Sequence, residues 1–523
     1  MATLSSLASM AVGVPRFMAR PLTERQALDE LRRRMASREE RFLASASTLI
    51  FANPHSPYAR LLEWAGMQEG DLARLVRSEG LEGALRTLRD AGVFVSMQQI
   101  KGLSPIERNG LLIETAAAAF DSPASHGLRS SSSGTRSAAT SVSWDWPLIE
   151  EHASNERVLH AMHRFDDFPL ALWLPVPPGL AGMHSALLQV KGRRRIERWF
   201  TPVAPGEAGS KVLGKRSLEA GASYIRAWSR IFGCPIPSPQ TVRAAGAATV
   251  ARWMSERRAE GTPPILRTYA GLALRAVRAG LDAGLDLDGS IVLTGGEPLT
   301  EARRRFFLDA GVHAVARYSS SEAGLIGASC PAALHGDDMH LYADRLGVIG
   351  TSEGDGAAST LLFTSISPHT GKVLLNADIG DEARIEDIQC DCALGRIGMR
   401  TRLREVRSNA KLTAGGMAVP AAVMESIVAA EVMKNGGAPS DFQIVQAEMT
   451  TGDACVEIVI SPRLQLDEKE FLDGVARQLA SAPQGGELAS LIWKQEGTIR
   501  IVQREPVLTR GAKQPLVAGT KSA

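Results

Sequence analysis

Three short segments carry glycines beside hydroxyl, aromatic and carboxylate side chains, in an order that suits the binding of a nucleoside triphosphate. The first is Ser132-Ser133-Gly134-Thr135, in which hydroxyl donors and a glycine would let the backbone wrap phosphate oxygens. Serine runs are also typical of flexible linkers, so this segment alone is weak evidence. The second is Thr294-Gly295-Gly296-Glu297-Pro298-Leu299, and the third is Tyr318-Ser319-Ser320-Ser321-Glu322-Ala323-Gly324. Their order along the chain is more specific than any one of them.

The second and third segments have chemistry that fits the two ends of such a ligand. Gly295 and Gly296 would let a flat ring lie against the backbone at the carboxyl end of a sheet, where α/β folds bind ligands. In the third segment the Tyr318 ring could stack on a base, the hydroxyls could hold a phosphate and Glu322 could ligate Mg²⁺. Each segment could equally be a polar turn after a strand, with Pro298 near the first turn of a helix.

These segments need strands that end beside one another, and the sequence around them predicts such strands. Ile291-Val292-Leu293 and residues 312–315 are short apolar runs typical of strands, and a helical pattern over residues 299–310 lies between them. From about residue 141 to 350, short apolar runs alternate with longer helical patterns. This alternation predicts an α/β fold with several layers.

The chain divides into three predicted regions. Residues 1–120 read as a helical lead-in that packs on something larger, with helical patterns over residues 23–47 and 70–92 and the spacing of a capping box at Thr23 and Gln26. Residues 1–22 are expected to be a ragged, partly disordered start. Residues 121–406 form the predicted nucleotide- and acid-binding core. Residues 407–523 combine helical and strand patterns, which predicts a small α+β domain at the C-terminus.

Composition argues against several classes of protein. Of the 523 residues 44% are hydrophobic and 22% are charged, which is typical of a globular protein. The 59 basic and 57 acidic residues give a net charge of +2, which argues against a general nucleic-acid binder. No apolar run approaches the ~18 residues of a membrane helix, and Arg16 and Arg20 follow the apolar stretch 7–14, the wrong order for a secretory signal. We therefore expect a cytoplasmic protein with neither a nucleic-acid nor a membrane partner.

Taken together, the segments resemble the adenylate-forming (acyl-CoA synthetase) superfamily, and within it the phenylacetate–CoA ligase-like branch. The resemblance covers roughly residues 125–518 and is carried by residues 264–269, 291–299, 318–324, 361–365 and 379–381. It implies a large multi-layer N-terminal adenylation domain of the α/β class with a small mobile α+β C-terminal domain. The first hundred or so residues are not obviously part of it.

The resemblance implies a set of nucleotide-binding residues. Those that match the phosphate loop are Ser132, Ser133, Gly134 and Thr135, and those that match the segment lining adenine are Gly295, Gly296, Glu297 and Pro298. Tyr318 would flank the base. Asp381 would accept hydrogen bonds from both ribose hydroxyls, which suits the two oxygens of a carboxylate.

The resemblance also implies the groups that would handle the charge of ATP. Ser321 would lie near the α-phosphate, and Glu322 would hold Mg²⁺. Arg404 or Arg407 stands where the family has its interdomain arginine. The segment Arg510-Gly511-Ala512-Lys513 resembles the loop that delivers the catalytic lysine, so Lys513 would bridge the carboxylate and the α-phosphate.

The chain departs from the family's pattern at two places that bear on activity. The phosphate loop continues with Arg136, Ser137 and Ala138 where the family has threonine, glycine and lysine, so Arg136 could replace the missing cation or the loop could be impaired. At the hinge, Asn409 and Ala410 stand where the family has aspartates. These changes leave the nucleotide half-reaction better supported than the second half-reaction.

Three cysteines and one histidine could form a metal site. Cys330, Cys390 and Cys392 with an imidazole would make the closed tetrahedral site of a structural zinc ion, which some members of the branch carry. Two histidines follow Cys330 closely. The shorter spacing favours His335, whereas matching the strand to the family favours His340. The alternative is three buried thiols, which free cysteines commonly are.

The function that the resemblance implies is the ATP-dependent activation of a carboxylic acid to an acyl-adenylate with release of pyrophosphate, then transfer to a thiol with release of AMP. The branch favours an aryl acid and coenzyme A as the thiol. A carrier protein or a protein cysteine is an alternative acceptor, and a zinc-stabilised, nucleotide-binding relic without activity is an alternative function. The presence of Glu322, Asp381 and Lys513 argues against a relic, because a relic has no need for all three.

Overall fold

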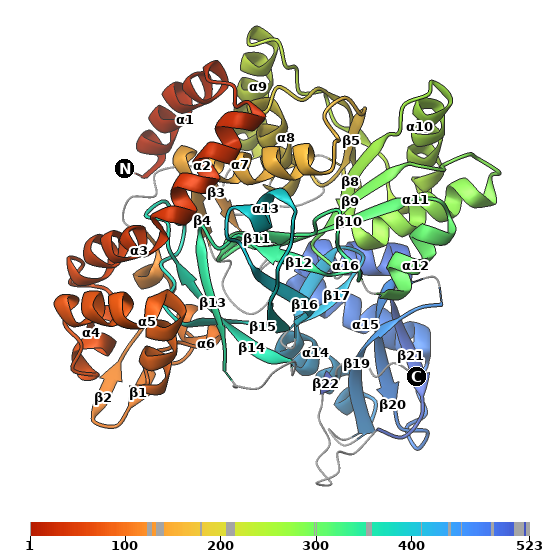
Figure 1. Ribbon diagram of the computed structural model, residues 1–523. Coiled ribbons are helices and arrows are strands. Elements are labelled where there is room, and N and C mark those ends of the chain that lie inside the picture. The colour runs from red at the N-terminus through yellow and green to blue at the C-terminus, as the bar shows by residue number, and fades with distance from the viewer. Residues whose placement is uncertain are drawn as a thin grey trace.

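A mixed sheet of twelve strands forms the centre of the molecule in this computed structural model (Figure 1). Its order is β13-β14-β15-β16-β12-β11-β10-β9-β8-β5-β6-β7. The structure describes residues 2–122, 128–131, 141–177, 180–204, 215–297, 299, 301–351, 358–408, 411–437, 441–450, 452–482, 486–506 and 517–518.

One half of the sheet is parallel. Its strands are β5 (Leu170–Trp173), β6 (Ile196–Thr201), β7 (Gln240–Thr241), β8 (Ile265–Tyr269), β9 (Ile291–Gly295) and β10 (His313–Ser320). All four residues of β5 are buried, as expected for a parallel strand covered on both faces. The strands predicted at residues 291–293 and 312–315 are confirmed by β9 and β10, and α12 (Glu301–Asp309) confirms the helix between them.

The other half of the sheet is antiparallel. Its strands are β11 (Gly324–Ala328), β12 (Met339–Leu341), β13 (Leu346–Gly350), β14 (Ser359–Ser365), β15 (Ala377–Asp387) and β16 (Thr401–Ser408). Burial alternates along the first part of β15, because successive side chains of a strand point to opposite faces.

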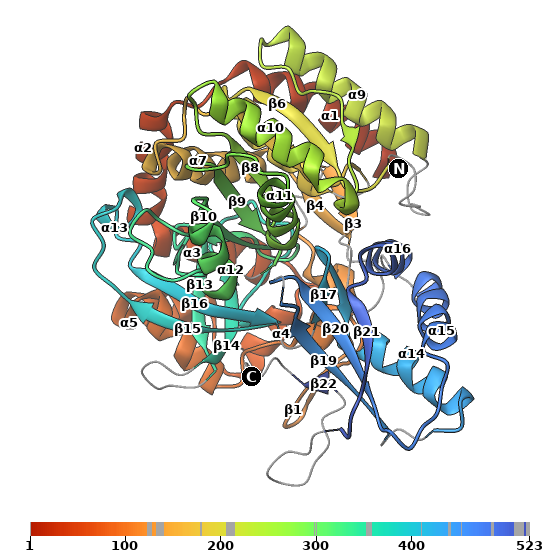
Figure 2. The same cartoon turned by 90° about the vertical axis from the view of Figure 1, so that its right-hand side faces the viewer.

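Helices cover both faces of the parallel strands (Figures 1 and 2). On one face α7 (Trp146–Met162) packs against α8 (Leu180–Lys191), and on the other α10 (Ala247–Ala259) packs against α11 (Ala270–Asp282), with α12 beside α11. The helix α9 (Lys215–Ile231) lies next to α1 (Ala2–Ala19). The short strands β3 (Leu128–Ser131) and β4 (Ser141–Trp144) pair antiparallel.

The N-terminal region is mostly helical. The ragged start expected for residues 1–22 is wrong for residues 2–19, which form α1 and pack on α9. After α1 come α2 (Glu24–Ala36), α3 (Arg38–Ala46), a π-helical turn (Ser47–Phe51), α4 (Pro57–Trp64), α5 (Glu69–Asp90), α6 (Met97–Ile100), the hairpin β1 (Ile106–Arg108) and β2 (Leu111–Ile113), and a 3₁₀ turn (Ala117–Phe120). The capping box predicted at Thr23 and Gln26 is present. Apolar side chains of this region belong to the same buried cluster as the large sheet. Among the described residues, no helix is long and apolar enough to cross a lipid bilayer.

A smaller α+β unit follows the last strand of the large sheet. It contains the hairpin β17 (Lys411–Ala414) and β18 (Met417–Pro420), the helices α14 (Ala421–Lys434), α15 (Glu468–Ser481) and α16 (Gly486–Glu496), and a sheet of β19 (Phe442–Glu448), β20 (Ala454–Ile460), β21 (Ile499–Gln503) and β22 (Val517–Ala518). Its buried apolar residues form a second cluster. The expected fold class, a large α/β unit with a small C-terminal α+β unit, is confirmed.

Candidate active site and candidate metal centre

The carboxyl ends of the parallel strands gather several of the residues singled out in the sequence. Tyr318, near the end of β10, donates a hydrogen bond through its hydroxyl to Asp381 Oδ2 over 2.5 Å. Asp381 lies on β15 and is 5% exposed, whereas Tyr318 is half-buried. Burial, followed by the charge of Asp381, raises the pKa of Tyr318 well above its ordinary value, so the tyrosine remains the donor. The structure thus joins the residues matched to the base and to the ribose.

Ser321 and Glu322 lie in the turn between β10 and β11. Glu322 is 6% exposed. Ala323 N donates to Ser320 Oγ over 2.9 Å, which closes the turn. Gly324 has φ +72°, and a Cβ there would stand 2.8 Å from His152 Nε2, so the turn requires glycine at that position. The buried carboxylate of Glu322, held in this turn, has the chemistry to bind a cation.

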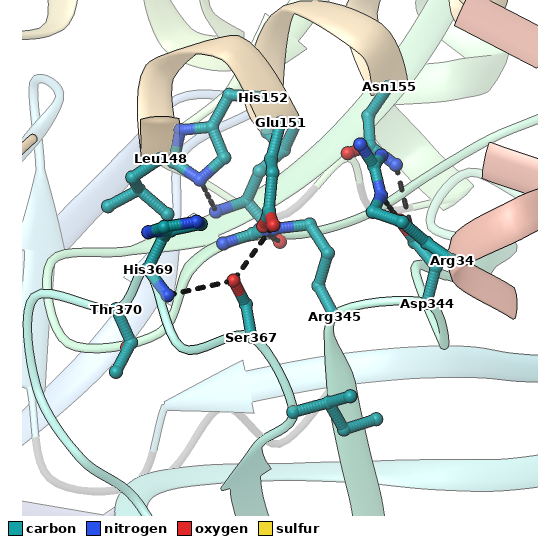
Figure 3. A network of polar contacts seen from close by, with 12 residues as sticks. Arg34, Leu148, Glu151, His152, Asn155, Asp344, Arg345, Ser367, His369 and Thr370 are labelled. Atoms are coloured by element: carbon teal, nitrogen blue, oxygen red, sulfur yellow. Dashed lines mark hydrogen bonds and ion pairs between the residues drawn. The ribbon is translucent and has the colours of Figure 1, made fainter. Parts of the chain in front are cut away.

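A buried polar network, drawn in Figure 3, contacts the strand that follows this turn. His152 Nε2 accepts from Leu325 N over 3.5 Å, and its Nδ1 lies 3.0 Å from His184 Nε2. Burial and nearby guanidinium groups hold the pKa of both histidines well below the usual value, so both imidazoles are neutral. Glu151, the neighbour of His152 on α7, accepts from Arg345 and from Ser367 Oγ. The network therefore supports the turn from α7.

The same network ties the N-terminal helices to the large sheet. Arg34 of α2 donates through Nε to Asp344 Oδ2 over 2.8 Å, and both side chains are almost fully buried. Arg41 of α3 pairs with Glu151 over 2.9 Å. The N-terminal helices thus contribute two arginines that pair with Asp344 and with Glu151 of the network.

Glu297 turns its carboxylate toward the small domain. Its Oε2 accepts from Gly271 N over 2.7 Å and from Arg303 Nη1 over 3.1 Å. Its Oε1 accepts from Gly416 N, in the turn between β17 and β18. Nothing in the sequence predicted this contact, because the resemblance assigned Glu297 only to the adenine segment.

A tyrosine that sequence reasoning did not single out for a role occupies the point where the domains meet. A Cβ on Gly296 would stand 2.7 Å from one edge of the Tyr269 ring, and a Cβ on Gly416 would stand 2.5 Å from the other. Both glycines have positive φ, +76° and +73°. The ring at the end of β8 is therefore held between glycines of two domains. The Gly415-Gly416 pair between two short strands is the sequence signal that would have predicted a hairpin turn here.

The two arginines proposed for the domain boundary both pair within the large domain. Arg404 and Arg407 lie on β16. Arg404 Nη1 lies 3.1 Å from Glu386 Oε1, and Arg407 Nη1 lies 3.1 Å from Asp337 Oδ2. The remaining site residues fall outside the described part of the chain, namely Ser132, Ser133, Gly134, Thr135, Arg136, Pro298 and Lys513.

A second group of buried charges lies where α16 meets the large domain. Glu496 Oε2 lies 3.7 Å from Arg275 Nη2, and Asp453 Oδ1 lies 3.8 Å from Arg275 Nε. Burial first, and then the charges of Glu297 and Asp453, raise the pKa of Glu496 to about 7. Glu496 Oε2 finds no hydrogen-bond donor among the described residues.

Replacing Glu496 by glutamine is expected to stabilise the protein above pH 7. The pKa of Glu496 is higher in the folded protein than its ordinary 4.5, so its contribution to stability is complete below about pH 4.5 and is lost as the pH rises through 7. The loss amounts to about 3 kcal/mol at pH 8.5, and glutamine avoids it. Melting temperatures at pH 5.5 and 8.5 check this, with Glu487→Gln, exposed on the same helix, as control. A pH-independent difference would contradict it.

Four side chains from distant segments meet in a candidate metal centre. The ligand atoms of Cys330, His340, Cys390 and Cys392 all lie within 4.8 Å of one another. Cys330 Sγ and Cys390 Sγ are 3.8 Å apart, and Cys392 Sγ and His340 Nε2 are 3.4 Å apart. Tetrahedral zinc places two thiolates about 3.8 Å apart and a thiolate and an imidazole about 3.6 Å apart. The group thus has the chemistry and spacing of a structural zinc site, whereas His335 is exposed and outside it.

Neighbouring groups orient these ligands. His340 Nδ1 lies 2.8 Å from Met399 O, which leaves Nε2 to face the three sulfur atoms. Gly395 N donates to Cys392 Sγ over 3.3 Å, at the start of α13 (Ala393–Arg396). A Cβ on Gly395 would stand 1.9 Å from Cys390 O, so only glycine lets the Cys-x-Cys segment fold back in this way. Support of this kind for the ligands is typical of a metal site.

No protein-family model matches the chain, and no curated protein matches it in sequence. Among solved structures, the chain is similar to 2-hydroxyisobutyryl-CoA ligase in complex with 2-HIB-AMP and CoA in the thioesterification state. The identity is 13%, the match covers 92% of this chain and 90% of that one, and the TM-score is 0.52. The chain therefore has the fold of that ligase over nearly its whole length.

Two further structures are more distant. A malonyl-CoA ligase with methylmalonyl-CoA and AMP bound is 12% identical, with 84% of this chain and 95% of that one covered and a TM-score of 0.40. An o-succinylbenzoate-CoA synthetase variant from Bacillus subtilis is 9% identical, with 76% and 69% covered and a TM-score of 0.42. Scores at this level carry no argument about this chain.

Proposed function

We propose that this protein is an AMP-forming acid–thiol ligase, which activates a carboxylic acid with ATP and transfers it to coenzyme A. The observation that carries the proposal is the hydrogen bond from Tyr318 to the buried Asp381 at the carboxyl edge of the sheet, together with the buried Glu322. A phenol that can stack on a base and a carboxylate that can accept from a ribose stand together there. The fold shared with a CoA ligase over 92% of the chain supports this reading.

In the first half-reaction a carboxylate oxygen of the acid attacks the α-phosphorus of ATP. The bond between that phosphorus and the bridging oxygen breaks, and pyrophosphate leaves. The attack brings an anion toward a polyanion, so the site must supply positive charge where charge develops. In our proposal Lys513 and Arg136 supply cations, and Glu322 holds the Mg²⁺ that accompanies ATP. Ser321 lies beside the α-phosphate, and Ser132, Ser133, Gly134 and Thr135 receive the pyrophosphate.

In the second half-reaction the thiol sulfur attacks the carbonyl carbon of the adenylate. The sulfur loses its proton, the bond from that carbon to the phosphate oxygen breaks, and AMP leaves. The two steps require different groups at one site, which residues 407–523 would exchange by rotating as a domain. The present contact between the Gly415-Gly416 turn and the large domain corresponds, in our proposal, to the second step. The similar ligase structure is described as being in the thioesterification state, which favours this assignment.

The identity of the acid is the finer part of the proposal. The resemblance to the phenylacetate–CoA ligase-like branch favours an aryl acid. A panel of aryl, branched and fatty acids in an ATP–pyrophosphate exchange assay tests the activity and identifies the acid together. The same panel with coenzyme A distinguishes a free thioester product from transfer to a carrier protein. Absence of exchange with every acid would favour a nucleotide-binding relic.

We further propose that Cys330, His340, Cys390 and Cys392 hold a structural zinc ion. All four protein ligands are supplied, so the site has no open position for a substrate. The ion would link the turn after β11 and the strand β12 to the segment between β15 and β16. We expect a cytoplasmic protein, because thiolate ligands and unpaired cysteines suit a reducing compartment.

Replacing Asp381 by alanine is expected to raise the KM for ATP about 100-fold. The change removes the acceptor for two ribose hydroxyls, each worth roughly 1.5 kcal/mol with a charged partner, and leaves the buried Tyr318 hydroxyl without its acceptor. Exchange kinetics at varied ATP measure the effect. The matched control is Asp387→Ala, an exposed aspartate that is the last residue of β15. An unchanged KM for ATP in the Asp381 variant would remove this residue from the site.

A further inference from the structure

One arginine of the large domain reaches into the small domain. Arg303 lies on α12, and its Nε donates to Gly452 O over 2.7 Å. Its Nη1 donates to Glu297 Oε2 over 3.1 Å, and Glu448 of β19 lies 3.9 Å from Nε. The Arg303 and Glu297 side chains are 2% and 1% exposed. The guanidinium therefore bridges a carboxylate of its own domain and a backbone carbonyl of the other.

The carboxylate of Glu297 is also shared between the two domains. Its Oε2 faces the large domain, where Gly271 N and Arg303 donate to it. Its Oε1 accepts from Gly416 N in the small domain. Both members of the ion pair lie in the large domain, so they stay together when the small domain moves away. That movement would instead remove Gly416 N from Glu297 and Gly452 O from Arg303, and each buried charged group would lose a hydrogen-bond partner. The pair and its two backbone contacts therefore favour one arrangement of the domains over others.

These contacts fix a turn that stands at the carboxyl edge of the sheet. Gly416 packs against Tyr269, which ends β8, and on its other side Tyr269 packs against Gly296, which follows β9. The backbone of Gly296 belongs to the segment matched to adenine. The position of the Gly415-Gly416 turn is thus coupled to the candidate nucleotide site through one ring and one carboxylate.

We propose that Arg303 and Glu297 are the positioning pair for the thiol-transfer half-reaction, because they hold the Gly415-Gly416 turn at the carboxyl edge of the sheet. The inference rests on the proposed function. Only an enzyme whose domains change arrangement between two steps needs a residue pair that stabilises one of the two arrangements. The pair acts through the turn, and its loss leaves the first half-reaction in place.

Hydrogen exchange on the full-length chain without substrate tests the structural part of the proposal. Arg303→Met removes both donors, and residues 411–420 are expected to exchange about 10- to 100-fold faster. The matched control is Arg304→Met, because Arg304 lies on the same helix and pairs with Glu301 of that helix. Hydrogen exchange of residues 411–420 in this control should match that of the unchanged protein. Equal protection of the turn in both variants overturns the proposal, whatever the activity of the enzyme.

Separate measurement of the two half-reactions tests the proposed role of the pair in thiol transfer. With an acid that supports ATP–pyrophosphate exchange, the Arg303→Met variant should catalyse that exchange at the rate of the unchanged protein. It should form thioester from supplied acyl-adenylate about 10- to 100-fold more slowly. Equal loss of both steps overturns the positioning role, because a merely structural residue affects both. If the unchanged protein shows no pyrophosphate exchange, the proposed function is refuted instead. The hydrogen-exchange rates of residues 411–420 still test whether Arg303 holds the turn.

A conservative variant covers the case in which Arg303→Met does not fold. Arg303→Lys keeps one cation, which can serve either Glu297 or Gly452 O but not both. It should give turn protection and thioester rates between those of the unchanged protein and the methionine variant. Rates and protection equal to those of the unchanged protein would show that the two-sided contact of Arg303 has no role.

Discussion

Replacing Lys513 by alanine is expected to abolish formation of the acyl-adenylate while sparing thioester formation from a supplied acyl-adenylate. The first step joins two anions, and the lysine ammonium is the cation proposed to lie between them. Removing one preorganised group that stabilises developing charge commonly costs about 10²–10³-fold in rate. The second step cleaves a mixed anhydride with a thiol and has no such need.

The two half-reactions must therefore be measured separately, by pyrophosphate exchange and by thioester formation from synthetic acyl-adenylate. The matched control is Lys494→Ala in the same domain, because Lys494 pairs with Asp473 on the surface and is 65% exposed. The control should keep both activities. Equal loss of both steps in Lys513→Ala would refute the division of labour between the two steps.

Replacing Cys392 by serine is expected to abolish binding of the proposed zinc ion and to destabilise the large domain. Cys392 starts α13, lies 3.4 Å from His340 Nε2 and accepts from Gly395 N, so its loss opens the tetrahedral set and unties a turn. Structural zinc supplies on the order of 10 kcal/mol to the folding of small zinc domains, and the free energy of unfolding should fall by part of that amount.

Metal analysis and thermal melting of the purified chain check this prediction. The unchanged protein should contain one zinc ion per chain and should lose melting temperature with a strong chelator. Cys455→Ala is the control, because Cys455 is buried in the small domain and lies outside the metal cluster. A zinc-free protein that melts unchanged in the presence of the chelator would leave the cluster as a set of buried thiols.

The strands and turns around the candidate site could be predicted because their signals are local. Apolar runs at residues 291–293 and 312–315 set the two strands, and a capping box at Thr23 set the start of a helix. The order of the glycine and hydroxyl segments then indicated the class of fold. Parallel strands end at one edge of a sheet, so residues at their carboxyl ends had to lie close together.

The choice between His335 and His340 could not be made from spacing. It depends on the pairing of β12 with β16, in which His340 lies opposite Arg402. This register brings His340 to Met399 O and to the Cys-x-Cys segment, and it leaves His335 exposed before the strand. A difference of a few residues along the chain carries no information about a partner sixty residues away.

The sequence by itself determined the chemistry available to this protein: which side chains exist, in what order, and on which kinds of local structure they lie. Only the tertiary structure decided that Glu297 turns to Gly416, 119 residues away, and that Arg303 reaches Gly452. The physical reason is that hydrophobic periodicity and turn preferences are set by near neighbours in the chain, whereas a hydrogen bond from a buried charged side chain to the backbone of another domain forms only where folding packs the two surfaces together.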